Sequence, residues 1–278
     1  MGSNGRSDFE YSSHKGNAVL ICRDGSVLAM FPDTLMKMEE QFLLHLAVLV
    51  ILLIPLCGQT SPVKQTLISK AGSTGYVSAT DPRPLEQALD ALQKKYGWGI
   101  DYEDPPYTSQ SGSGGTLNAE FALIPNTPPD QEKTLRAIID SYNQSKNPGR
   151  FELRTIASRG FDVVGISAND KHGHLSQQEV SLDSPVTIPV APRSASETIA
   201  LICEKIAQRS AVNIHLGVYP RNVLDYTSVT VGGNASPART LLTSTLAATS
   251  HKIYWRMLFD PNSNSYYLNL HSVSTPKP

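Results

Sequence analysis

Apolar positions change their period within residues 83–102, whose sequence is RPLEQALDALQKKYGWGIDY. Four of them recur at intervals of three and four residues: Leu85, Ala88, Leu89 and Leu92. This spacing predicts the buried face of a helix, which Asp81 and Pro82 would start and Gly97 would end. From Trp98 to Glu103 apolar and polar residues alternate, and this period of two predicts a strand with one buried face. The segment therefore predicts a helix that leads directly into a strand.

The same pattern returns later in the chain. Helical spacing is found at Ile199, Ile202, Cys203 and Ile206. Ser194 or Ser196 would cap this second helix. Strand alternation follows, with apolar residues at Val212, Ile214 and Leu216. The chain is therefore expected to contain one structural unit twice.

The segments that follow also match. In the first copy residues 117–123 predict a strand, residues 128–142 (PPDQEKTLRAIIDSY) a helix, and FELRTIA with FDVVGIS a hairpin. In the second copy the corresponding segments are Val229 and Val231, then SPARTLLTSTLAATS, then KIYWRMLF with YYLNLHSV. Each helix begins at a proline, which suits the first turn of a helix. GYVSA and VTIPV offer a leading strand in each copy. Such a repeat indicates duplicated small domains.

The second copy resembles the secretin and TonB short N-terminal domain. The resemblance rests on SETIALICEKIAQRSAVNIHLGVYPRN, VTVGGNASPARTLLTSTLAATSHKIYW and YYLNL, and RPLEQALDALQKKYGWGIDY resembles the opening helix and strand of that domain. The first copy departs from the pattern by the polar loop PPYTSQSGSGG and by YNQSKNPGR before its hairpin. The resemblance implies a periplasmic docking domain, of the sort found at the front of secretin channels and signal-transducing outer-membrane receptors. No segment of residues 60–278 has the alternating pattern of membrane strands.

The predicted fold class is α+β, with two tandem small domains, each having two helices packed on short mixed or antiparallel sheets. We place the first domain at residues 76–170 and the second at residues 185–273, with linkers at 60–75 and 171–184. Residues 36–59 are predicted to be a signal peptide. Residues 1–35 show no sustained periodicity, and are expected to be a non-globular extension or to precede the true start at Met36 or Met38.

The signal peptide is predicted from the apolar run FLLHLAVLVILLIPL at residues 42–56. The run is shorter than the roughly 18 to 20 residues that cross a bilayer, and small Gly58 follows at a plausible cleavage position. We therefore expect a periplasmic or secreted protein. Two alternatives remain open, in which residues 42–56 stay uncleaved as a membrane anchor or Cys57 carries a lipid.

Composition and charge limit the class of partner. Lysine and arginine number 24 against 25 aspartate and glutamate, so the net charge is -1 and no global field would attract nucleic acid. The three cysteines, Cys22, Cys57 and Cys203, have no metal-ligand or redox spacing. Cys203 lies in an apolar helical face and is expected to pack in the core.

Patterns that would indicate catalysis are missing from the sequence. SGSGG at residues 111–115 lacks the Lys-Ser/Thr of a phosphate-binding loop, and no GxSxG elbow occurs. His172 and His174 would make only an incomplete metal site and are expected in a surface loop. Asp101, Glu103 and Asp104 are expected on a solvated strand face. We predict no enzyme activity, no cofactor and no metal.

The last hairpin offers one candidate binding face. Trp98 and Trp255 are in phase with apolar neighbours and are expected in the core. The opposite phase mixes aromatic, cationic and apolar residues, a composition enriched in protein interfaces. The candidate partner-binding residues are Tyr254, Arg256, Leu258, Tyr267 and His271.

Together these patterns predict an exported, non-enzymatic protein-binding or docking module of the bacterial cell envelope, accessory to a secretin, pilus or outer-membrane receptor system. The expected partner is another envelope protein, with membrane contact only through an uncleaved N-terminal segment. Two rivals remain open. One is a ring-forming structural subunit of a secretion machine, and the other is an envelope hydrolase with an unrecognised site.

Overall fold

The computed structural model describes residues 10–14, 17–21, 27–32, 67–81, 83–107, 115–124, 127–156, 159–170, 172–210 and 212–273. Residues 1–63 and 64–278 form two separate compact units. The predicted signal peptide, residues 36–59, lies outside the described residues. No helix within the described ranges is long and apolar enough to span a membrane.

Three antiparallel strands are described in the first unit: β1 (Glu10–His14), β2 (Asn17–Ile21) and β3 (Val27–Pro32). This differs from the expected non-globular extension. Two short apolar runs, NAVLI and VLAMFP, flank Asp24-Gly25, which is a common hairpin sequence. This local hairpin signal is present although residues 1–35 show no sustained periodicity.

The second unit carries the repeat. Its first half contains β4 (Leu67–Ala71), β5 (Thr74–Asp81), α2 (Pro84–Tyr96), β6 (Ile100–Glu103), β7 (Gly115–Ala122), α3 (Gln131–Gln144), β8 (Arg150–Ile156) and β9 (Gly160–Asn169). The connection contains β10 (Leu175–Gln177) and the 3-10 helix η3 (Ser181–Asp183). The second half contains β11 (Pro185–Ser194), α4 (Ala195–Ala207), β12 (Asn213–Leu216), α5 (Arg221–Leu224), β13 (Ser228–Pro237), α6 (Ala238–Ala248), β14 (Ile253–Asp260) and β15 (Ser265–Ser272).

Helix ends follow from local chemistry. α2 begins with Pro84 at its first position, two residues later than Asp81 and Pro82 would place it, and ends at Gly97, whose φ of 68° is left-handed. The Asp130 side chain accepts the Lys133 amide at the start of α3. Of the two caps that the sequence offers for α4, Ser194 and Ser196, the structure uses Ser194, which forms a capping box with Glu197.

Strand pairing is the same in the two halves. β5 pairs with β7 as β11 pairs with β13, and both pairs are antiparallel. β6 runs parallel to β9 as β12 runs parallel to β15. β8 pairs antiparallel with β9 as β14 does with β15. The repeat read from the sequence is therefore present in the topology.

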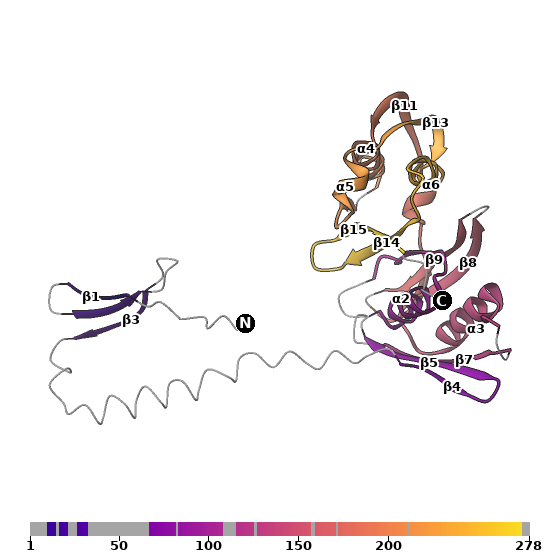
Figure 1. The fold of residues 1–278 in the computed structure, drawn as a ribbon, viewed down its shortest axis with the longest axis horizontal. Coiled ribbons are helices and arrows are strands. Elements are labelled where there is room, and N and C mark those ends of the chain that lie inside the picture. Colours follow the sequence, from indigo (N-terminus) through magenta and orange to yellow (C-terminus); the bar gives the residue numbers. More distant parts are fainter. Residues whose placement is uncertain are drawn as a thin grey trace, which may run out of the picture. The chain divides into compact units, whose positions relative to one another are not determined.

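The two halves are joined through one sheet, because β6 of the first half pairs with β14 of the second. Its strand order is β8-β9-β6-β14-β15-β12. The short strand β10 pairs with the last residues of β9, on the same side of β9 as β6. Figure 1 shows α4 and α6 on one face of this central sheet and α2 and α3 on the other. The fold is thus a mixture of helices and sheets, as expected, but a division into two separate domains is not confirmed.

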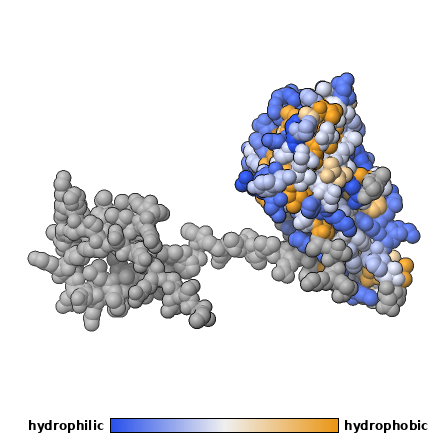
Figure 2. Space-filling view, turned by 45° about the horizontal axis from the view of Figure 1, so that its top comes forward, coloured by the Kyte–Doolittle hydropathy of each residue, from blue (hydrophilic) through white to orange (hydrophobic). Residues whose placement is uncertain are grey.

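The core lies between each helix pair and its sheets. Trp98 and Trp255 are 8% and 0% exposed, and Cys203 is 3% exposed, in agreement with the sequence analysis. In the first half, Phe151 stacks on Tyr102 and meets the edge of Tyr142. Hydrophobic residues also reach the surface of the second unit among hydrophilic ones (Figure 2).

Candidate functional site

The junction between the halves combines a short parallel ladder with two carboxylates. Arg256 is opposite Tyr102 and Met257 is opposite Glu103, and the Asp104 amide donates to the Met257 carbonyl at 2.9 Å. Asp104 also accepts the Phe259 amide at 3.0 Å. Asp101 accepts the Trp255 amide at 2.8 Å. At the two ends of this short ladder, the side-chain carboxylates of Asp101 and Asp104 therefore accept backbone amides of β14 in place of main-chain carbonyls.

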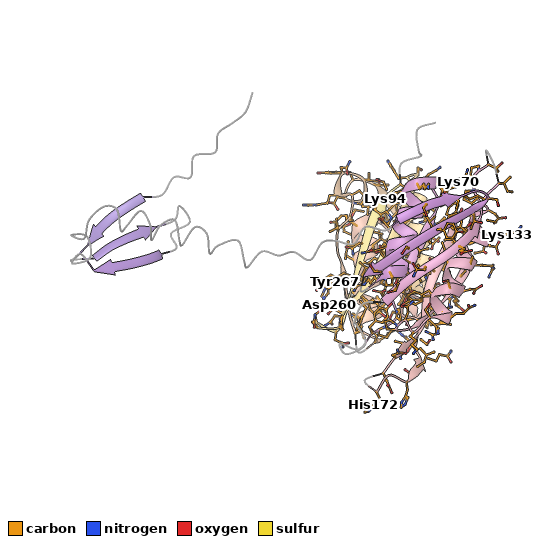
Figure 3. All side chains as sticks on the ribbon, turned by 90° about the horizontal axis from the view of Figure 1, so that it is seen from below. Lys70, Lys94, Lys133, His172, Asp260 and Tyr267 are labelled. Atoms are coloured by element: carbon orange, nitrogen blue, oxygen red, sulfur yellow. The ribbon has the colours of Figure 1, made fainter. Side chains whose placement is uncertain are left out.

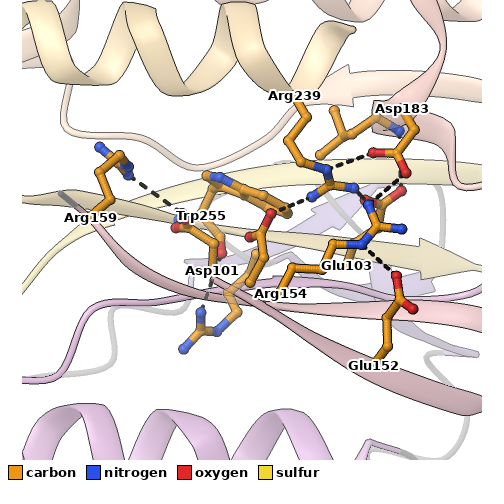
Figure 4. Close-up of polar contacts among 11 residues, drawn as sticks. Asp101, Glu103, Glu152, Arg154, Arg159, Asp183, Arg239 and Trp255 are labelled. Atoms are coloured by element: carbon orange, nitrogen blue, oxygen red, sulfur yellow. Dashed lines mark hydrogen bonds and ion pairs between the residues drawn. The ribbon is translucent and has the colours of Figure 1, made fainter. Parts of the chain in front are cut away.

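Arg239, near the start of α6, holds the junction from one face of the sheet (Figure 4). Its Nη1 and Nε donate to Asp162 at 2.7 Å and to Asp183 at 2.8 Å, and its Nη2 donates to Glu103. The guanidinium is 5.4 Å from the centre of the Trp255 ring. One residue of the second half thus neutralises carboxylates of β6, β9 and η3.

Arg154 extends this network at the surface. It binds Asp183 through Nη1 at 2.6 Å and Glu152 through Nε. Asp183 is therefore shared by two guanidinium groups, Arg239 and Arg154, which link α6 and β8 to η3.

The opposite face of the sheet is held by α2. The Arg256 Nη2 donates to Gln93 at 2.6 Å, and its Nη1 donates to the Ile100 carbonyl at 2.5 Å. Glu86 lies 3.4 Å from Arg256 Nε. Each half therefore sends helix side chains onto strands of the other half.

Two further arginines neutralise the remaining carboxylates. Arg83 donates to Asp104 at 2.7 Å, and the Tyr102 hydroxyl donates to the same carboxylate at 2.6 Å. Arg159 Nη2 lies 3.5 Å from Asp101. Every buried carboxylate of β6 and Asp104 thus has an arginine partner.

The expectation that Asp101, Glu103 and Asp104 lie on a solvated strand face is wrong, because each of them is only 1% exposed. Burial raises the pKa of the Asp101 carboxyl to about 7; nearby Asp162 adds to this rise, and Arg159 opposes it. Burial also raises the pKa of Glu103 and of Asp104 against the opposing effects of Arg239 and Arg83. These groups are paired inside the protein and offer no open acid or base to a substrate.

α2 contacts two of the five residues of the candidate binding face on the last hairpin, Arg256 and His271. Arg256 is 4% exposed, while Tyr254 and Leu258 are half-buried. His271 Nε2 lies 3.1 Å from Gln93, and burial followed by the charge of Arg256 lowers the pKa of His271 to about 4. Tyr267, at 39%, is the most exposed of the predicted set and lies on the surface near Asp260 (Figure 3). Whether this face binds a partner stays a prediction.

Other residues singled out by sequence have no catalytic arrangement. His172 and His174 belong to a projecting loop, and within the described ranges no group of three or more His, Cys, Asp or Glu residues is placed to hold a metal. Burial raises the pKa of Cys203 to about 12, so its thiol is not activated. Residues 111–114 of the SGSGG stretch lie outside the described residues.

Surface hollows are separate from this network. One depression of about 460 Å³ is lined by residues of β4, the end of α2 and the segment before α3, including Lys70, Lys95 and Tyr96. A second lies at the start of β7 beside Asn147. Neither is lined by the junction carboxylates or arginines.

The outer strands of the central sheet are β8 and β12. The Gly217 amide donates to the Leu268 carbonyl, so by alternation the amides and carbonyls of Ile214 and Leu216 point away from β15. Two exposed apolar side chains lie beside β12: Val218, which follows the strand, at 77%, and Tyr267, whose ring is 5.5 Å from that of His215, at 39%. An edge strand with such neighbours is suited to pair with another strand.

Sequence reasoning missed the arginines that make the junction, above all Arg239, Arg159 and Arg83. The signal available was an excess of carboxylates on the presumed outer face of a short strand. Comparisons of the chain with protein-family models, with curated proteins and with solved structures found no match.

Proposed function

We propose that this chain is an exported, non-enzymatic docking module of the bacterial cell envelope, which binds a protein partner by strand addition to its central sheet. The observation that carries the proposal is the edge strand β12, whose outward backbone groups are flanked by exposed apolar side chains. Backbone hydrogen bonds supply affinity in this mode, so no specialised polar site is needed.

The repeated topology supports the finer form of this proposal. Each half would correspond to one domain like the secretin and TonB short N-terminal domain, with its helix pair between a small sheet and a three-strand portion of the central sheet. Here the two copies are fused edge to edge. Periplasmic or secreted location, through cleavage of residues 36–59, is part of the proposal.

An envelope hydrolase is less well supported. Asp101, whose pKa burial raises to about 7, is 1% exposed and is bound by Trp255 and Arg159. An enzyme would need such a group to reach substrate.

The test compares two variants at one position of β12. Leu216→Pro removes the outward amide, a change that edge strands tolerate, whereas Leu216→Ala removes the same side chain and keeps the amide. Tagged full chains are isolated from crosslinked cell envelopes, and bound proteins are identified by mass spectrometry. The proposal predicts envelope proteins that are recovered with the wild type and with Leu216→Ala and lost with Leu216→Pro. Equal recovery with all three would contradict strand addition at β12.

A further inference from the structure

The strands at the two ends of the central sheet are the repeat equivalents of the two strands that meet in its middle. Val163 of β9 lies between Tyr102 of β6 and Leu153 of β8. Leu268 of β15 lies between Leu216 of β12 and Met257 of β14. β6 is therefore equivalent to β12, and β14 to β8. Inside the chain β6 pairs with β14, which leaves β12 and β8 as the outer strands.

We propose that the partner of β12 is β8 of a second copy of this chain, joined in parallel as β14 joins β6. This inference rests on the proposed function and names the occupant of the same edge. Because the second copy would present its own β12, the association continues through successive copies.

Backbone groups on β8 have the phase that this pairing requires. Within the chain, Trp255, Met257 and Phe259 present their amides or carbonyls to β6 and its neighbour Asp104. On β8 the Phe151 amide and carbonyl bind the Asn143 side chain, so they point away from β9. By alternation the groups of Leu153 and Thr155 also point outward. In the register of the internal joint Leu216 would lie opposite Glu152, so its amide would meet the Phe151 carbonyl beside Asn143 and its carbonyl would meet the Leu153 amide.

Side chains above the proposed joint differ from those of the internal joint in a compatible way. In the internal joint Arg239, the second residue of α6, lies over Glu103 of β6 and Asp162 of β9. The second residue of α3 is Glu132. In the repeat, Gly217 takes the place of Glu103 and Tyr267 that of Asp162. Glu132 would therefore not be placed over either of these carboxylates.

The geometry favours an open filament over a ring. β6 and β14 are parallel, while β9 and β15 therefore run in opposite directions, and the helix pairs lie on opposite faces of the sheet (Figure 1). One repeat is thus related to the next by a half-turn about an axis across the strands. Two half-turns restore the orientation, so successive copies differ by a translation of about 29 Å, for six strands at about 4.8 Å each, together with the twist of the sheet.

The test uses sedimentation velocity of the purified full chain over a range of concentrations. Two edge variants, Leu216→Pro on β12 and Leu153→Pro on β8, each remove one outward amide. Leu216→Ala and Leu153→Ala are the matched controls, because they lose the same side chains and keep the amides. Circular dichroism and thermal unfolding check that every variant is folded.

The proposal predicts that the wild type and both alanine variants form species that lengthen with concentration. Each proline variant alone weakens association by about tenfold or more, since it loses a strand hydrogen bond and gains a steric block. An equimolar mixture of the two proline variants forms a dimer and nothing longer, because each retains the edge that the other has lost.

Three results would overturn the proposal. They are a wild type that stays monomeric at every concentration, a proline variant that still dimerises with itself, and a mixture that remains monomeric while both variants are folded. A monomeric wild type that captures a different envelope protein through β12 would overturn self-association and leave the docking function standing.

Discussion

Asp101 in β6 accepts a hydrogen bond from the backbone amide of Trp255 in β14, with 2.8 Å between carboxylate oxygen and amide nitrogen. The two residues belong to different copies of the repeat. A side chain of the first copy thus completes the strand pairing of the second, and the copies depend on each other for their buried polar groups.

This contact predicts a pH-dependent stability difference between the wild type and Asp101→Asn. The pKa of Asp101 is about 7 in the folded protein, above its ordinary value of about 3.9, so the folded state holds a proton that the unfolded chain has released. The stability due to Asp101 is full at low pH and is lost as pH rises toward 7. The wild-type unfolding free energy, relative to that of the variant, should fall by up to about 1.4 kcal/mol per pH unit between pH 5 and 7.

Urea unfolding at pH 5, 6, 7 and 8 measures this difference. The comparison with the variant is needed because His271, whose pKa is lowered to about 4, changes stability in the opposite direction over part of the same range. A wild-type minus variant difference that is constant with pH would contradict a buried Asp101 with a raised pKa.

Removal of the Arg239 guanidinium should be strongly destabilising. Arg239→Ala leaves Glu103 and Asp162, 1% and 0% exposed, without their main cation. Loss of one partner from a buried pair costs about 3–5 kcal/mol. The control is Arg221→Ala, since Arg221 forms a solvent-screened surface pair with Asp225 and its loss should destabilise the protein far less. Similar unfolding free energies for the two variants would show that Arg239 does not hold the junction.

Alanine substitution of two glycines with positive φ distinguishes the cost of close packing from the cost of backbone strain. Gly160 has φ of 121° and a Cβ there would lie 2.3 Å from the Gly99 carbonyl oxygen, whereas Gly173 has φ of 82° and open space around it. Both alanine variants pay the left-handed backbone cost of about 1–2 kcal/mol. Gly160→Ala should lose roughly 1–3 kcal/mol more from overpacking. Thermal unfolding compares them, and equal losses would contradict the close approach of Gly160 to Gly99.

Cys203 should resist alkylation in the folded protein. It is 3% exposed and burial raises its thiol pKa to about 12, so little thiolate is present at neutral pH. Iodoacetamide labelling followed by peptide mass spectrometry should find the Cys203 peptide unmodified in native buffer and fully labelled in denaturant. Rapid labelling in native buffer would show that the Cys203 thiol is accessible and reactive, and would make it a candidate nucleophile again.

Sequence periodicity predicted the repeated elements well because their cores are local. The stripe from Leu85 to Leu92 and the stripe from Ile199 to Ile206 pack in α2 and α4 as their spacing requires. The capping box at Ser194 depends only on neighbouring residues, and it too was predictable.

What covers the second face of a strand could not be predicted in the same way. Asp101 and Glu103 alternate with apolar residues, which ordinarily indicates an exposed face, but Arg159 covers Asp101 and Arg239 covers Glu103, both from far along the chain. Arg256 was expected on an open face for the same reason and instead meets Gln93 and Glu86. A period of two defines the two faces of a strand, but it does not show that either face is exposed to solvent.

The central claim is that the two copies form one sheet and therefore one cooperative unit. The chain has two tryptophans, Trp98 in the first copy and Trp255 in the second, so single-tryptophan variants report on each copy separately. Guanidinium unfolding of Trp98→Phe and of Trp255→Phe is followed by fluorescence and by far-ultraviolet circular dichroism. The account predicts that, within each variant, both signals change in one coincident transition. A fluorescence transition clearly separated from the loss of secondary structure would mean that the copies unfold independently, and would contradict the shared sheet.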